Sequence, residues 1–201
     1  MMKGAVLILG ALLLTACGGN LRTAEIVQYD FGNLSGKNTP ATVPIAAVDV
    51  QAASWLSGGA MHYRLAYAEP LRRQLYAESR WVAPPAELLE TYLKRRVIFG
   101  QPDSRGAGCR IHLALDELEQ RFDAPASSQA VLDVRAVLLP SRGAETLSRR
   151  SIHIEKAAAA PLAREGVAAA REAVEALAGA LDAWLGEVAR DQPSVVERCR
   201  S

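Results

Sequence analysis

Three cysteines and three histidines are the residues of this chain whose side chains could do covalent, redox or metal chemistry. A cysteine sulfur can act as a nucleophile, pair in a disulfide or ligate a metal. The chain lacks the G-x-S-x-G, H-E-x-x-H and G-x-x-x-x-G-K patterns, and no His/Cys/Asp/Glu group stands at metal-ligand spacing. We therefore expect a protein that is not an enzyme and holds no metal or other cofactor. The six residues are Cys17, Cys109, Cys199, His62, His112 and His153.

The first of these cysteines follows a short apolar segment. Met1-Met2-Lys3 is a positively charged start, residues 5–14 are apolar apart from Gly10, and small residues surround Cys17. An apolar run of this length is too short to span a bilayer, which needs about 20 residues. The layout is that of a secretory signal. A buried N-terminal strand or helix is the alternative.

The residues "LTAC", 14–17, resemble the lipobox of bacterial lipoproteins. The resemblance implies a signal peptide over 1–16 and a Cys17 that carries diacylglycerol on sulfur and an acyl chain, such as palmitate, on its nitrogen. More than one acyl chain gives firm membrane anchoring. Gly18 stands where an aspartate would favour the inner membrane, which implies the periplasmic face of the outer membrane. Residues 17–24 are expected to form a tether.

The other two cysteines would share an oxidising compartment. Such compartments favour a disulfide between Cys109 and Cys199, because the Cys17 sulfur would be occupied by lipid. Two unpaired thiols, one buried and one near the frayed C-terminus, are the alternative.

The elements that must position these residues follow from hydrophobic periodicity. A helix is predicted after Pro84-Pro85, and a long one over about 160–190 has a narrow apolar stripe. The stripe suits a helix lying on its own sheet, and a coiled coil is the alternative. Strands are predicted over residues 25–31, 45–50, 58–67, 72–81, 109–122, 130–139 and 146–156.

Short connections between the last three strands predict an antiparallel meander. In the first of them the apolar positions change parity between Leu115 and Leu118, which predicts a bulge near Asp116. The same alternation places His112 and His153 opposite the apolar face, as exposed polar residues or, alternatively, metal ligands. The fold class is α+β: one domain over 25–201, a mostly antiparallel sheet covered by the middle and C-terminal helices.

Two tryptophans, Trp55 and Trp81, are candidates for a lipid or partner contact or for the core. For Trp81, where a strand gives way to a helix, we favour the core, because large aromatic side chains are mostly buried. A net charge of +1 gives no indication of nucleic-acid binding.

Residues 62–93 resemble the ABC-type transport auxiliary lipoprotein family, which includes PqiC-like proteins. The similar features are Tyr63-Arg64, Arg80-Trp81 and the helix start at Pro84-Pro85 with Leu88-Leu89, preceded by "VPIAAVDV" and followed by the meander and the alanine-rich helix.

The family resemblance implies an accessory to an MCE (mammalian cell entry) lipid transport system that has a separate ATPase and permease. It implies no catalytic set of residues. A lipoprotein that itself carries a lipid or small apolar ligand is the alternative, and a homo-oligomeric state stays open.

Overall fold

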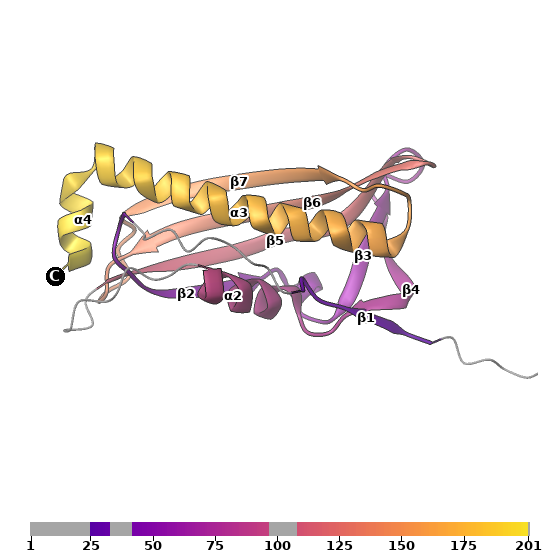
Figure 1. The fold of residues 1–201 in the computed structure, drawn as a ribbon, viewed down its shortest axis with the longest axis horizontal. Coiled ribbons are helices and arrows are strands. Elements are labelled where there is room, and N and C mark those ends of the chain that lie inside the picture. The colour runs from indigo at the N-terminus through magenta and orange to yellow at the C-terminus, as the bar shows by residue number, and fades with distance from the viewer. Residues whose placement is uncertain (1–24, 33–41, 97–107, 201) are drawn as a thin grey trace, which may run out of the picture.

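The computed structural model describes residues 25–32, 42–96 and 108–200. Cys17, the expected signal peptide over 1–16 and the expected tether over 17–24 lie outside these ranges. The chain forms seven strands, one 3-10 turn and three α-helices in the described part (Figure 1). In chain order they are β1 (Val27–Tyr29), β2 (Ile45–Ala52), η2 (Ser54–Leu56), β3 (Ala60–Leu65), β4 (Arg73–Trp81), α2 (Pro85–Arg96), β5 (Cys109–Ala124), β6 (Ser127–Leu139), β7 (Ser148–Ala157), α3 (Ala163–Asp191) and α4 (Pro193–Arg200).

The α+β class and the C-terminal meander are confirmed. One sheet has the order β1-β4-β3-β5-β6-β7, with β2 also paired to β5. The longest pairings, β5 with β6 and β6 with β7, are antiparallel, and Asp133 lies opposite His153 in the second. The sheet is nevertheless mixed, because β1 runs parallel to β4, and β2 and β3 both run parallel to β5.

The predicted bulge near Asp116 is confirmed. The register of β5 against β6 shifts between Leu115 and Glu117. Before the shift the odd-numbered residues up to Leu115 are buried, and after it Leu118 and Gln120 are buried instead. The extra residue therefore keeps apolar side chains on the helix-covered face along both halves of this long strand.

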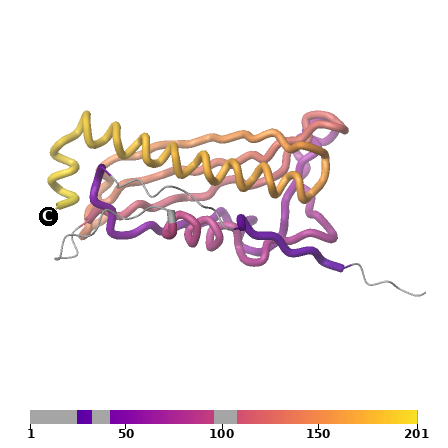
Figure 2. Tube along the Cα trace, in the orientation of Figure 1, coloured from indigo at the N-terminus to yellow at the C-terminus, as the bar shows by residue number. Residues whose placement is uncertain are grey.

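The long helix α3 lies across the sheet of its own domain, as predicted, and covers mainly β6 and β7 (Figures 1 and 2). The stripe residues are all buried against the sheet: Val167, Ala170, Val174, Leu177, Leu181, Trp184 and Val188. Several are alanine or valine, so the helix approaches the strands closely. The middle helix α2 begins at Pro85, where proline suits a first turn, and packs beside β2.

The opposite face of the sheet is polar. Asp49 pairs with His112, Asp116 with Arg135, and Asp133 with His153. Antiparallel sheets commonly bury one face and leave the other to solvent.

Helix α4 was not predicted. After α3 ends at Asp191, Pro193 starts a second, short helix that buries Val195, Val196 and Cys199. Charged residues separate Cys199 from the two valines in the sequence, so the apolar face of α4 becomes recognisable only once the helix is packed against the domain. The predicted first strand, 25–31, is also shorter in the structure, because only Val27–Tyr29 pair with β4.

Candidate functional site

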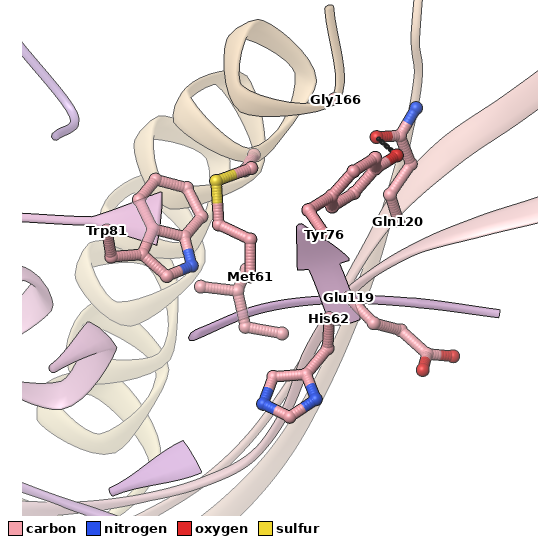
Figure 3. A pocket seen from close by; sticks show the side chains of 9 residues that line it. Met61, His62, Tyr76, Trp81, Glu119, Gln120 and Gly166 are labelled. Carbon is pink, nitrogen blue, oxygen red and sulfur yellow. Dashed lines mark hydrogen bonds between the residues drawn. The ribbon is translucent and has the colours of Figure 1, made fainter. Parts of the chain in front are cut away.

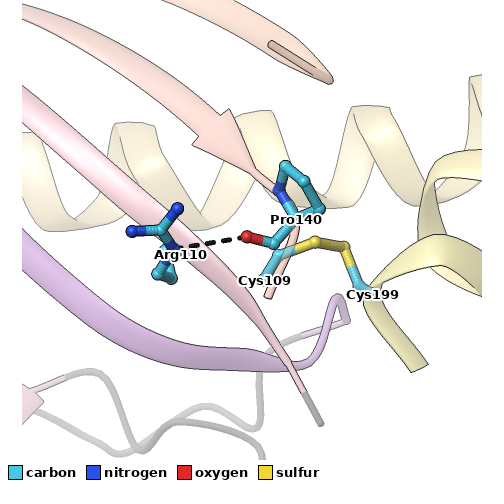
Figure 4. The surroundings of a disulfide bond; sticks show 4 residues. All are labelled: Cys109, Arg110, Pro140 and Cys199. Carbon is cyan, nitrogen blue, oxygen red and sulfur yellow. Dashed lines mark hydrogen bonds between the residues drawn. A yellow bond between two sulfur atoms is a disulfide. The ribbon is translucent and has the colours of Figure 1, made fainter. Parts of the chain in front are cut away.

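The structure brings Cys109 and Cys199 together in a disulfide bond (Figure 4). Cys109 is the first residue of β5, and its N–H donates to the Pro44 carbonyl at 2.8 Å. Cys199 lies in α4, 4.7 Å away between Cα atoms, and both residues are fully buried. The bond joins α4 to one end of the sheet.

Trp81 lies in the core, whereas Trp55 lies at the surface. Trp81 is 6% exposed and packs on Phe31 with ring centroids 5.3 Å apart. Trp55, in η2, is 53% exposed, and the Arg73 guanidinium carbon lies over its indole ring, 5.7 Å from the ring centroid. A cation over an aromatic face is attracted to it, so Arg73 stabilises the indole on one side while about half of the side chain stays in solvent.

A small cavity lies between the sheet and α3, lined by Met61, Tyr76, Trp81 and Leu118 among others (Figure 3). Its volume is about 20 Å³. A single water molecule needs about 10–15 Å³ on this measure, so the cavity has room for one water. It is therefore far too small for a lipid.

The Gln120 amide makes a buried network beside this cavity. Its nitrogen donates to the Ser128 hydroxyl at 2.8 Å and to the Leu162 carbonyl at 3.4 Å, and its oxygen accepts from Tyr76 at 2.8 Å. Burial raises the pKa of the Tyr76 phenol, so this group stays a donor. Gly166, in the first turns of α3, lies so close that a Cβ there would stand 1.9 Å from the Gln120 oxygen.

Four charged residues form a partly buried cluster on the face of the sheet that α3 does not cover. We call it the arginine–glutamate cluster, and its members are Arg64, Arg73, Glu117 and Glu119. Arg73 makes a two-pronged contact with Glu117 at 2.6 and 2.5 Å, and Arg64 donates to Glu119 at 2.9 Å. The hydrogen bond that Arg73 donates to Glu117 is the main cause that raises the pKa of Arg73. Sequence reasoning missed this cluster, because it depends on the register of β3, β4 and β5.

His62 lies beside the cluster and is only 8% exposed. Neither ring nitrogen has a well-formed hydrogen bond to another described residue. A weak interaction with the Trp55 backbone favours the protonated ring and has the smallest effect on the pKa. Burial, and then the charge of Arg73, lower the pKa of His62. The surroundings of His62 therefore favour the neutral ring.

The other two histidines lie on the polar face, each beside a carboxylate. His112 contacts Asp49 at 2.5 Å, and His153 contacts Asp133 at 2.5 Å and Glu155 at 3.2 Å. The hydrogen bond to Asp133 is the main cause that raises the pKa of His153. Across residues 25–32, 42–96 and 108–200, no group of three or more His, Cys, Asp or Glu side chains is arranged to hold a metal ion.

Exposed large apolar side chains gather in one half of the molecule. They occur on or next to β1, η2, β3, β4 and the start of α3. Within the described ranges, α4 and the β6–β7 connection carry none. The eight residues are Ile26, Val27, Trp55, Tyr67, Leu71, Leu75, Val82 and Leu162. Each helix that the structure describes is either too short or too polar to span a bilayer.

Comparison with solved structures finds two chains that are similar in fold. The crystal structure of protein XCC0632 from Xanthomonas campestris, of family DUF330, matches 86% of this chain and 92% of its own, at 16% identity and a TM-score of 0.61. A crystal structure of an uncharacterised protein matches 80% of this chain and 99% of its own, at 12% identity and a TM-score of 0.61. Both are similarities of fold.

No curated protein sequence shows significant similarity to the chain. A family model described as the ABC-type transport auxiliary lipoprotein component matches residues 37–181. The chain belongs to the family of ABC-type transport auxiliary lipoprotein components.

Proposed function

We propose that this protein is a non-enzymatic, lipid-anchored accessory of an MCE-type lipid transport system, held at the periplasmic face of the outer membrane. Membership of a transport auxiliary lipoprotein family, shown over residues 37–181, is the observation that carries the proposal. The "LTAC" sequence ending at Cys17 supports it, since lipid on that sulfur and nitrogen would supply the anchor.

The proposed mechanism is positional. The first strand residue, Val27, lies ten residues after Cys17. At roughly 3.3 Å per residue this stretch reaches at most about 33 Å, so the domain stays near the bilayer. There it would dock the end of the MCE assembly, so that a transported lipid passes to the membrane without entering water.

Crosslinking tests this proposal. A tagged protein, crosslinked in intact cells and purified from detergent extracts, should bring down an MCE protein and, through it, the permease and ATPase. Cys17→Ala is the matched control, because it leaves the described domain unchanged and should release the protein from the outer membrane. Recovery of no MCE component from cells that express one would count against the proposal.

The alternative, a carrier that holds a lipid itself, needs an apolar chamber. The cavity between the sheet and α3 has room for one water. A second recess, about 310 Å³, is an open groove between β2 and α2. Because neither the cavity nor the open groove encloses an apolar ligand, we favour the accessory role. Native mass spectrometry that finds the purified protein with bound lipid, beyond that on Cys17, would reverse this preference.

A further inference from the structure

We propose that one end of the domain, which we call the apolar end, rests on the phospholipid surface with the β3–β4 turn inserted among the headgroups. The apolar end is defined by Ile26, Val27, Tyr67, Leu71 and Leu162. The inference rests on the proposed lipid anchor at Cys17 and adds to it the face and the residues that meet the membrane.

The β3–β4 turn, residues 66–72, presents the most exposed apolar side chain of the described chain. Leu71 is 96% exposed and Tyr67 is 47% exposed. Exposing a leucine side chain to water is unfavourable. Tyrosine has an apolar ring and a polar hydroxyl, and it is enriched where proteins meet a membrane interface.

The turn holds Leu71 outward through its own bonds. The Arg64 guanidinium donates to the Pro70 carbonyl at 3.0 Å, and Arg72 N–H donates to the Glu69 carbonyl at 3.0 Å. Arg64 is itself fixed by Glu119 in the arginine–glutamate cluster. The exposure of Leu71 is therefore a fixed feature of the turn.

Other parts of the chain meet the turn at the same end. Tyr67 N–H donates to the Phe122 carbonyl, which sets the β3–β4 turn beside the β5–β6 turn. Leu162, half exposed, precedes α3 and accepts from Gln120, two residues before Phe122.

Strand β1 begins at the same end of the long axis as the two turns (Figure 1). Ile26 and Val27 there are 47% and 45% exposed. Because the link from Cys17 enters the domain at this strand, the anchor draws the apolar end, and not the other, toward the bilayer.

The opposite end differs from the apolar end in its exposed apolar side chains and not in its charges. Among the described residues, the β6–β7 connection and α4 expose no large apolar side chain, whereas both ends carry ion pairs, Arg198 with Glu145 at the far end and Arg72 with Glu69 in the β3–β4 turn. A bilayer is the occupant that accounts for both the exposed apolar side chains of the apolar end and the point where the anchor enters.

The test uses the full acylated protein in vesicles of phosphatidylethanolamine and phosphatidylglycerol, some lipids carrying a nitroxide quencher on the acyl chain. Leu71→Cys is labelled with the environment-sensitive dye NBD. Arg142→Cys, exposed in the β6–β7 connection, is the matched control at the far end. Both sites are exposed, so neither label disturbs the core. Flotation of the vesicles reports the anchor independently of the dye.

The proposal predicts that NBD at position 71 shifts to shorter wavelength and is quenched by the nitroxide lipid, while NBD at 142 does neither. Water-like emission at 71 on floating vesicles would overturn the inference and leave the lipid anchor standing. A blue shift that lipid nitroxide does not quench would assign the apolar end to a protein contact, and so also overturn it. Protein that fails to float would refute the anchor itself and this inference with it.

Discussion

Replacing Gly166 with alanine is expected to destabilise the domain, although alanine is the better helix former. A Cβ at this position would stand 1.9 Å from the Gln120 amide oxygen and 2.4 Å from its carbon. The Gln120 amide must therefore move. It is 5% exposed and bonded to Tyr76, Ser128 and the Leu162 carbonyl, so it has no free path to solvent.

The magnitude follows from the bonds that would break. Losing the two 2.8 Å bonds of Gln120, to Tyr76 and Ser128, costs about 1–3 kcal/mol for each buried group left unpaired. Alanine in place of glycine inside a helix returns about 1 kcal/mol. Gly166→Ala should therefore lower the free energy of unfolding by about 1–5 kcal/mol.

Urea unfolding of residues 25–201, with the disulfide intact, measures this change. The matched background is Gln120→Ala, which removes the obstructing amide. In that background Gly166→Ala should stabilise the protein by up to about 1 kcal/mol, because only the helix preference remains. An equal loss of stability in both backgrounds would refute the steric argument.

Three further predictions use the same unfolding measurement. Trp81→Ala should cost about 3–5 kcal/mol, because it empties a buried site, whereas Trp55→Ala should cost about 1 kcal/mol or less; similar losses would contradict the burial difference. Replacing both Cys109 and Cys199 by alanine should lower stability by about 2–5 kcal/mol, since the bond closes a loop across 90 residues; two free thiols in the unfolded, unreduced wild type would show that the bond does not form. The folded-state pKa of His62 is lowered, so the unfolded chain binds more protons and stability should fall as pH drops below about 6.5. In His62→Leu the fall between pH 7.5 and 5.5 should be smaller, and an unchanged fall would exclude His62 as its cause.

Local patterns predicted the parts of the fold that depend on one element at a time. The change of parity between Leu115 and Leu118 was enough to locate the bulge at Asp116, because a buried face leaves little freedom of register. The apolar stripe of α3 predicted its packing for the same reason. Helix α4 was not predicted, because two adjacent residues, Val195 and Val196, are too few to show the hydrophobic periodicity of a helix.

Contacts between distant strands could not be predicted in this way. Because β3 pairs in parallel with β5, Arg64 lies opposite Arg121 in the strand register. The Arg64 guanidinium then donates a hydrogen bond to Glu119. No local sequence pattern in β3 or β5 indicates that Arg64 and Glu119 are in contact. The closeness of Gly166 to Gln120 likewise follows only from how α3 crosses the sheet. Sequence indicated Cys109 and Cys199 as a pair, whereas their geometry required the unpredicted α4.

The charges on the polar face restrict how the edge strand β7 can align. Eight residues, 140–147, join β6 to β7, enough to absorb a slip of two positions that would keep every side chain on its own face. In the observed register Asp133 faces His153 and Arg135 faces Ser151. A slip of two residues one way would oppose Asp133 to Glu155, and the other way Arg135 to Arg149. Like charges directly opposite each other are destabilising, so the observed alignment is the one that avoids both repulsions.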